Sequence, residues 1–306
     1  MILIITHKLD FTADYIINKL NQKRIPYKRF NCEDLLKTDI IFELNNDFTY
    51  NILGENNYSS VWFRRIKLPE LDLNSIWHKQ YILSEIDSFL HNIFTVLNCQ
   101  WVSEPYNVYK AENKLLQLKT AQFLGFKIPD TIITTVKEEV SIFFKKHEHT
   151  IVKPISRTRI NNISVPEFIF TNRIDANQQS NFQNYDLTPC IFQEEIEKQV
   201  EIRVTIVGEK VFAATVRSQD DNETKTDWRR KKLKFTKFEL PINISNKCIS
   251  IVKKLKLNFG AIDLILSPNG EYTFLEINPN GQWVWIENDT GLKISEALID
   301  LLQCKK

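Results

Sequence analysis

Two apolar strands decide the fold, and the sequence predicts both within residues 261–281, AIDLILSPNGEYTFLEINPNG. Asp263 lies within the first strand, and Glu276 and Asn278 lie two positions apart in the second. Side chains two apart in a strand point to the same face, so Glu276 and Asn278 converge, and an antiparallel neighbour can add Asp263. A single acid in a strand is usually solvent-facing, but hard oxygen donors on two neighbouring apolar strands suit Mg²⁺. We therefore expect a metal site here.

Two lysines give a second signal. Lys153 interrupts the apolar run Ile151-Val152 just before Pro154, and Lys114 lies at the start of a predicted helix. Each alone is typical of a surface lysine whose aliphatic stem covers apolar neighbours. Beside a set of metal-binding oxygens, however, a compact ammonium group is a suitable donor to phosphate oxygens.

A third signal follows residue 190. The strand that enters residues 192–198, FQEEIEK, ends in a polar turn, and the next strand carries Glu201 and Arg203 on one face. Arg217 ends the strand expected at 211–217, and an arginine can neutralise the charge that develops on a transferred phosphoryl group. A cross-strand salt bridge explains Glu201 and Arg203 equally well.

Two adjacent arginines, Arg64 and Arg65, end the strand expected at 61–65, VWFRR. Ligand-binding groups usually lie at the ends of strands in α/β sheets. Since neighbours on a strand point to opposite faces, we expect one arginine to reach a ligand and the other to make a structural ion pair. The alternative is that both are simply exposed.

The remaining pattern indicates an α/β protein, because strand and helix signals alternate along the N-terminal part. Strands are expected at 2–5, 27–30, 40–44, 150–154, 190–196, 201–207, 211–217, 261–266 and 272–278, and helices at 11–22, 75–97 and 109–125. Residues 218–232 are typical of a polar loop. We expect three domains, at 1–102, 103–190 and 191–306.

Composition excludes several classes of protein. The chain has 306 residues and a formal net charge of +2, which gives no electrostatic case for a nucleic-acid partner. No apolar run approaches the length of a membrane span, and the apolar N-terminus lacks the basic start of a signal peptide. The five cysteines are scattered without a CxxC pair, which is typical of reduced thiols. We expect a cytoplasmic protein without a membrane partner.

In this order the motifs resemble the ATP-grasp superfamily over about residues 100–290. The segments that carry the resemblance are 113–114 (NK), 151–154 (IVKP), 193–196 (QEEI), 201–208 (EIRVTIVG), 213–217 (AATVR), 261–263 (AID) and 274–283 (FLEINPNGQW). Within the superfamily, VWFRR at 61–65, NKLLQL at 113–118 and NPNGQWVWIE at 278–287 are similar to the maturases of graspetides, the microviridin-type ribosomal peptides. The resemblance implies an ATP-grasp fold with an N-terminal α/β pre-ATP-grasp domain, a central domain and a C-terminal domain with an antiparallel sheet.

The resemblance also implies a role for each group. ATP and Mg²⁺ would be the cofactors, and the metal would be held by Asp263, Glu276 and Asn278. The nucleotide would be bound by Lys114, Lys153, Gln193, Glu194, Glu195, Ile196 and Glu201, with adenine at the hinge 193–196 and the ribose near Glu201. Catalysis would involve Lys153, Arg203 and Arg217, with Arg217 facing the acyl phosphate. The acidic part of the substrate would meet Arg64 and Arg65, with Arg203 as a further candidate.

One segment departs from the superfamily pattern. The stretch after Lys153, residues 155–160 (ISRTRI), has no glycine, whereas ATP-grasp lids are often glycine-rich at this place. Side chains of Ser156, Arg157 or Thr158 would therefore replace the contacts that a glycine-rich backbone makes to phosphate.

The implied reaction has two steps. The γ-phosphate of ATP passes to a Glu or Asp side chain of a ribosomal precursor peptide with a leader and an acidic core. A hydroxyl or amine of the same peptide then displaces phosphate and closes an ω-ester or ω-amide ring. A RimK-like ligase that adds amino acids, and a non-catalytic nucleotide-binding module, stay open as alternatives, although the complete set of oxygen ligands argues against the second. A homodimer is also left open.

Overall fold

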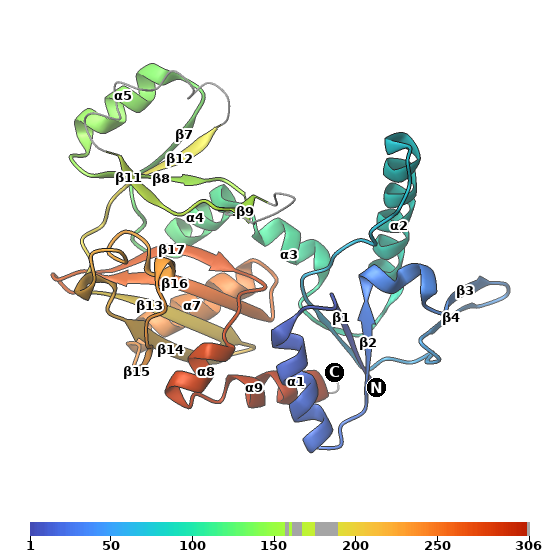
Figure 1. The fold of residues 1–306 in the computed structure, drawn as a ribbon. Coiled ribbons are helices and arrows are strands. Elements are labelled where there is room, and N and C mark those ends of the chain that lie inside the picture. The colour runs from blue at the N-terminus through green and yellow to red at the C-terminus, as the bar shows by residue number, and fades with distance from the viewer. Residues whose placement is uncertain (157–158, 161–166, 175–188, 305–306) are drawn as a thin grey trace.

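The computed structural model describes residues 1–156, 159–160, 167–174 and 189–304, and Figure 1 shows their arrangement. The chain forms three larger sheets in sequence order, each with its own covering helices. Among the described helices, none combines the length and the apolar character needed to cross a bilayer. A parallel N-terminal sheet is followed by two antiparallel sheets, and an antiparallel C-terminal sheet is what the resemblance implies.

The N-terminal sheet is parallel and buried on both faces. Its strands lie in the order β2 (Tyr27–Asn31), β1 (Ile2–Thr6), β5 (Ser60–Phe63) and β6 (Gln100–Val102). Alternate residues of β1 serve opposite faces. Ile2 and Ile4 pack with α1 (Phe11–Gln22) and α9 (Ile294–Gln303), whereas Leu3 and Ile5 pack with α2 (Ile76–Val96). A 3₁₀ helix, η1 (Cys32–Lys37), leads to a separate hairpin of β3 (Ile40–Leu44) and β4 (Phe48–Ile52).

The central sheet is antiparallel and has a small core of its own. Its strands lie in the order β11 (Asn172–Ile174), β8 (Thr150–Pro154), β12 (Cys190–Glu194) and β7 (Thr131–Thr134). Helix α5 (Lys137–Lys146) covers the sheet with Val140, Phe143 and Phe144, which pack around Phe192. A short pair, β9 (Arg159–Ile160) and β10 (Glu167–Phe168), follows β8 in the chain.

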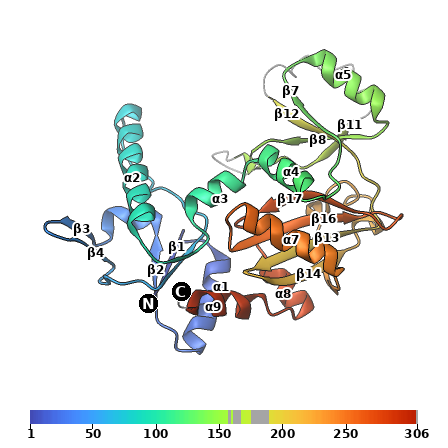
Figure 2. The same ribbon diagram turned by 180° about the vertical axis from the view of Figure 1, so that it is seen from behind.

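The C-terminal sheet is antiparallel and carries the three expected metal ligands, Asp263, Glu276 and Asn278. Its strands lie in the order β15 (Thr236–Phe238), β14 (Lys210–Val216), β13 (Val200–Val207), β16 (Phe259–Leu266) and β17 (Tyr272–Asn278). Helix α7 (Ile242–Lys254) packs against the middle of one face, and α4 (Lys114–Phe123) lies beside the outer strand β17 (Figure 2). The remaining elements are the 3₁₀ helices η3 (Ser218–Asp220) and η4 (Trp228–Arg230) and the helix α8 (Val284–Thr290).

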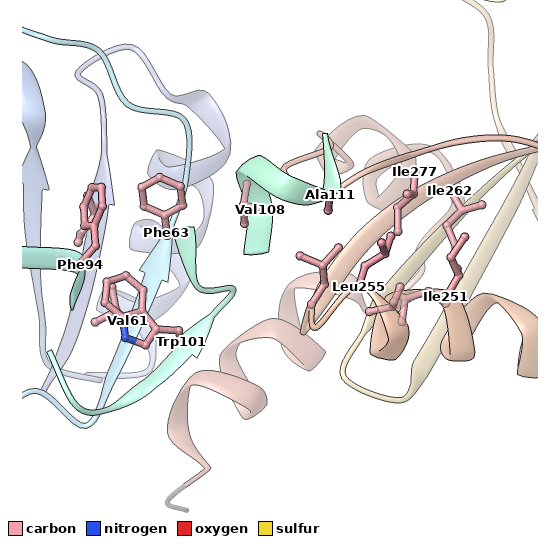
Figure 3. Packing of buried hydrophobic residues seen from close by; sticks show 14 of the residues in the cluster. Val61, Phe63, Phe94, Trp101, Val108, Ala111, Ile251, Leu255, Ile262 and Ile277 are labelled. Carbon is pink, nitrogen blue, oxygen red and sulfur yellow. The ribbon is translucent and has the colours of Figure 1, made fainter. Parts of the chain in front are cut away.

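One apolar core joins the N-terminal and C-terminal sheets through α3 (Pro105–Ala111). Figure 3 shows Val108 and Ala111 of this helix between the aromatic residues of the N-terminal sheet and the aliphatic residues of β16, β17 and α7. The chain end ties the same two parts together. Ser60 Oγ donates a hydrogen bond to the carbonyl oxygen of Leu302 at 2.7 Å, and Gln100 Nε2 donates to that of Leu301 at 2.8 Å.

Three details differ from the sequence expectation. The helix expected at 109–125 is two helices, because α3 ends at Ala111 and the Asn113 side chain caps α4 by accepting from Leu116 N. Strand β5 ends at Phe63, so both arginines follow the strand. The boundary expected between 190 and 191 falls inside β12, and we propose to place it after Glu194.

Candidate active site

A cavity of about 1170 Å³ lies where the three sheets meet. Its wall combines side chains from all three: Arg65 follows β5, Lys153 and Gln193 come from the central sheet, and Glu276 and Asn278 come from β17. Both charged and apolar groups line it, so it can take a large polar ligand. Most residues that the sequence singled out meet here.

The three expected metal ligands come together through the register of β16 and β17. Asp263 lies directly opposite Glu276, and Asn278 lies opposite Ala261. The residue between the last two ligands, Ile277, is fully buried in the core on the other face. All three oxygen-bearing side chains line the cavity. The donor set of two carboxylates and an amide beside open space fits Mg²⁺, which keeps some of its coordination for water and phosphate.

The carboxylates are surrounded by cations. Lys114 Nζ lies 2.6 Å from Glu276 Oε2. Burial alone would raise the pKa of Glu276, but Lys114, Lys153 and Arg229 hold it well below its usual range. Burial raises the pKa of the neighbouring Asp263, and the charge of Glu276 adds to this. Burial also lowers the pKa of the Lys153 ammonium to about 8. Cations gathered around a metal-binding edge are what a polyphosphate requires.

Arg203 makes a cross-strand ion pair, the alternative explanation, whereas Glu201 pairs with Lys198, three residues earlier in the chain. Arg203 Nη1 donates to Asp263 Oδ2 at 2.8 Å across the strand pair. Glu201 Oε1 accepts from Lys198 Nζ at 3.1 Å and from Ser218 Oγ at 2.6 Å. Burial raises the pKa of Glu201, against the opposing effect of these two donors. Glu201 lines the cavity, and its place near the ribose stays a prediction.

The turn after β17 closes over Arg203. A Cβ at Gly281 would come within 2.7 Å of Arg203 Nη2 and 2.4 Å of Ala261 Cβ. A side chain at this position would therefore displace the arginine that pairs with Asp263. Glycine is the residue that permits this close approach.

The hinge residues 193–196 all line the cavity. Gln193 is fully buried, and its Nε2 donates to Thr131 Oγ1 at 2.8 Å. Its Oε1 is buried with no hydrogen-bond partner among the described residues. Glu194 is tied to the start of β7, because its Oε2 accepts from Asp130 N at 3.3 Å, and Glu195 pairs with Arg173. In the segment after β8, Ser156 lines the cavity, and Arg157 and Thr158 lie outside the described residues.

Arg217 does not take the place expected for it. Val216 pairs with Glu201 across the strands and shares its face, so the next residue turns away. The Arg217 side chain is exposed, and it is not among the described residues that line the cavity. This is a correction to the sequence expectation.

Arg229, which the sequence reasoning missed, lines the cavity instead. The buried Asp227 carboxylate holds it, since Arg229 Nε donates to Asp227 Oδ1 at 2.8 Å. Asp227 raises the pKa of this guanidinium, and Glu276 and Asp263 add to the effect. Asp227 Oδ2 also accepts from Thr171 N at 3.2 Å, which joins the loop to the central part of the chain. The only signal in the sequence was an aromatic residue in a charged loop, DWRR at 227–230.

Both adjacent arginines line the cavity, and Arg64 makes a buried ion pair, while contact of either one with a ligand stays a prediction. Arg64 is 1% exposed, and its Nε donates to Asp10 Oδ2 at 3.1 Å. Its Nη1 also donates to the carbonyl oxygen of Asn280 at 3.4 Å, which links the N-terminal sheet to the turn after β17. Arg65 is exposed and lines the cavity beside Lys67. Partial desolvation of its guanidinium beside the cavity wall and the charge of Arg64 lower the pKa of Arg65.

A family description for RimK-like ATP-grasp domains matches residues 111–302. The chain belongs to this family. The match covers α4, the central sheet and the C-terminal sheet, so every group placed above lies within it except Asp10, Arg64, Arg65 and Lys67 of the N-terminal part. The protein is an ATP-grasp ligase, an enzyme class that uses ATP and Mg²⁺.

Solved structures extend the similarity to the whole chain. A Chryseobacterium gregarium ribosomal-peptide-associated ATP-grasp ligase, solved with ADP and a leader and core peptide, has a TM-score of 0.89 and 29% identity, over 98% of this chain and 96% of that one. The macrocyclase MdnC of Microcystis aeruginosa, bound to its precursor peptide MdnA, has a TM-score of 0.87 and 27% identity, over 99% of both chains. Among curated proteins, the tetrahydromethanopterin:α-L-glutamate ligase of Methanocaldococcus jannaschii is 21% identical over 97% of this chain and 96% of its own length.

Proposed function

We propose that this ligase activates Glu or Asp side chains of a ribosomal precursor peptide and closes ω-ester or ω-amide rings within that peptide. The observation that carries the proposal is one cavity that is lined both by the expected ATP-binding residues and by Arg65 and Lys67, which follow strand β5 of the N-terminal sheet. The peptide-bound ligases described above, similar over nearly their full length, support a peptide as the partner of this enzyme.

The chain's own residues would act mainly by position and charge. Lys114 and Lys153 would bind phosphate oxygens, and Arg229 would meet the charge on the phosphoryl group as it moves. Asp263, Glu276 and Asn278 would hold Mg²⁺, which when bound neutralises phosphate charge. Adenine would lie at the hinge 193–196, whose four residues line the cavity.

Arg65 and Lys67 would orient the acidic side chain that is activated. A carboxylate oxygen attacks the γ-phosphorus, and ADP leaves. A hydroxyl or amine of the peptide then attacks the carbonyl carbon of the acyl phosphate and loses its proton as phosphate departs. The peptide loses the mass of one water for each ring formed.

The test uses the purified enzyme, ATP, Mg²⁺ and the peptide encoded by a short neighbouring reading frame with Thr and Glu/Asp blocks. We expect mass losses in multiples of water, with one ADP and one phosphate per ring. The same incubation without ATP is the control. A peptide that keeps its mass while the enzyme adds glutamate to an acceptor would overturn the macrocyclase proposal.

Addition of an amino acid to an acceptor is the second candidate, because the α-L-glutamate ligase matches almost its whole length. The same incubation with glutamate separates the two, since this reaction adds a glutamyl residue to the product. An acidic core in the precursor, a homodimer and a cytoplasmic location stay predictions.

A further inference from the structure

Strand β17 forms the outer edge of its sheet, and the Gln117 side chain pairs with this edge between Glu276 and Asn278. In an antiparallel pair, alternate residues direct their backbone groups away from the partner strand. Ile277 is such a residue opposite Ile262. Gln117 Oε1 accepts from Ile277 N at 3.1 Å, and Gln117 Nε2 donates to the Ile277 carbonyl oxygen at 2.8 Å. The amide of Gln117 therefore takes the place of a neighbouring strand.

Gln117 is itself firmly held. Its side chain is 1% exposed, and Nε2 also donates to the carbonyl oxygen of Ala111 at 2.6 Å. The three backbone partners fix which end of the amide is nitrogen, because the two carbonyls need a donor and the N–H needs an acceptor. The residue belongs to α4, the helix whose first residue, Lys114, pairs with Glu276.

The two peptide groups that Gln117 binds are those that flank Ile277. One joins Glu276 to Ile277, and the other joins Ile277 to Asn278. The Ile277 side chain is anchored in the core, where it packs so closely that a Cβ on Gly260 would meet its Cδ1 at 2.7 Å. Anchoring Ile277 by its side chain and by both backbone groups fixes the directions in which Glu276 and Asn278 point.

We propose that Gln117 is a positioning residue for the metal: it holds the peptide groups that orient Glu276 and Asn278 toward the cavity. The inference rests on the proposed assignment of these two residues as metal ligands. Replacing a group that orients metal ligands without touching the metal typically weakens metal binding by about 10- to 100-fold. A residue that only fills the interior would change stability and leave metal affinity alone.

The test measures metal binding directly, with Mn²⁺ in place of Mg²⁺ and with ADP bound. The electron paramagnetic resonance signal of free Mn²⁺ gives its dissociation constant. We expect Gln117→Met, which keeps the volume and removes all three hydrogen bonds, to weaken Mn²⁺ binding by about tenfold or more. Affinity for ADP in the presence of EDTA should stay at the wild-type value.

Thr120→Val is the matched control. Thr120 is buried on the same helix, and its Oγ1 donates to the Leu116 carbonyl oxygen at 2.6 Å within that helix, so its loss does not reach β17. Its Mn²⁺ affinity should be that of the wild type. If Gln117→Met fails to fold, Gln117→Glu keeps the shape and one acceptor but sets an oxygen against two carbonyls, and it should weaken Mn²⁺ binding in the same way.

A Glu276→Gln variant separates the two levels of the argument. If it weakens Mn²⁺ binding and the folded Gln117 variants do not, the positioning role is wrong and the metal assignment stands. If neither change affects Mn²⁺ binding, the metal assignment itself is wrong. A Thr120→Val variant that weakens Mn²⁺ binding as much as Gln117→Met would also overturn the specific role of Gln117.

Discussion

Glu276 is the residue on which the charges of the cavity converge. Lys114 touches it, Lys153 and Arg229 lower its pKa, and Asp263 faces it across the strands. We expect the Glu276→Ala and Asn278→Ala double variant to fold and to lose ATP-dependent ligation, because these side chains face the cavity rather than the core. Turnover assays and circular dichroism check both parts. Ligation at the wild-type rate would contradict the metal assignment.

A second prediction compares two arginines of the same loop region. Arg229→Ala should lower the maximal rate by about 100-fold or more with a small effect on ATP affinity, since charge on the moving phosphoryl group develops during the reaction. Arg217→Ala, at an exposed site, should turn over at nearly the wild-type rate. Steady-state kinetics at saturating ATP measures both. A slow Arg217 variant beside a fast Arg229 variant would restore the original sequence assignment.

A third prediction separates Arg64 from Arg65. Arg64→Ala leaves the Asp10 carboxylate buried without its partner and should lower the free energy of unfolding by about 3–5 kcal/mol. Arg65→Ala should fold like the wild type and bind ADP, but it should fail to modify the peptide. Denaturant titration and mass spectrometry measure the two effects. A fully active Arg65 variant would remove this residue from substrate binding.

The sequence predicted these residues unevenly, for a physical reason. Asp263, Glu276 and Asn278 lie on consecutive strands of a hairpin, so strand periodicity alone brought them together. Alternation of side chains along a strand predicted that Arg64 and Arg65 would have different surroundings, but not which of them would pair with Asp10. Arg229 reaches the cavity only through the buried carboxylate of Asp227, a contact that no local pattern reveals.

At the scale of elements, one carboxylate joins three helices. Glu287 of α8 accepts hydrogen bonds from Ser295 N and Oγ at the start of α9 and from Tyr15 of α1, and Lys19 of α1 pairs with it at 3.1 Å. Burial alone would raise the pKa of Glu287, but these donors lower it below its usual value of 4.5. The junction is therefore stabilised by the charged form.

We expect Glu287→Gln to lower the free energy of unfolding at pH 7 by about 1–3 kcal/mol, because an amide leaves one of these donors unpaired. A lowered carboxylate pKa stabilises the fold above the unfolded value of 4.5 and loses this effect as the pH falls. The difference in the free energy of unfolding between variant and wild type should therefore shrink below about pH 4.5. Glu296→Gln on α9, where the side chain is 46% exposed, is the control and should stay within about 0.5 kcal/mol. A gap that does not change with pH would contradict the ionic role.

The sequence predicted the presence of helices and strands better than it predicted their first and last residues. Most strands and the long helices followed from periodicity, whereas the break at residues 112–113 was missed because the apolar pattern runs across it. Asn113 was the available signal, since an asparagine before a helix is a strong cap. The domain boundary expected between residues 190 and 191 divides β12, because β12 pairs with β7 and β8, which precede it by many residues.

At the scale of the molecule, the central sheet stands apart. Its core is a small cluster around Phe192, separate from the two large clusters that run through the rest of the protein. We expect amides of β8 and β12 to exchange hydrogen faster than those of β13 and β16 in the free enzyme. Their exchange should slow when ADP and Mg²⁺ are added, because Lys153 and Gln193 line the cavity in which we propose that the nucleotide binds. Mass-detected hydrogen exchange tests this. Equal protection of both sheets in the free enzyme would contradict it.

Because α9 packs in the same apolar cluster as the first strand, this part of the core is complete only after α9 has been synthesised. Ile2 and Ile4 share one apolar cluster with residues of α1 and with Leu298 and Leu302 of α9, and the ends marked N and C lie side by side in Figures 1 and 2. Helix α1 follows the first strand directly, whereas α9 is translated about 290 residues later. A nascent chain that stalls before α9 therefore leaves part of this apolar face uncovered, where chaperones and proteases can reach it.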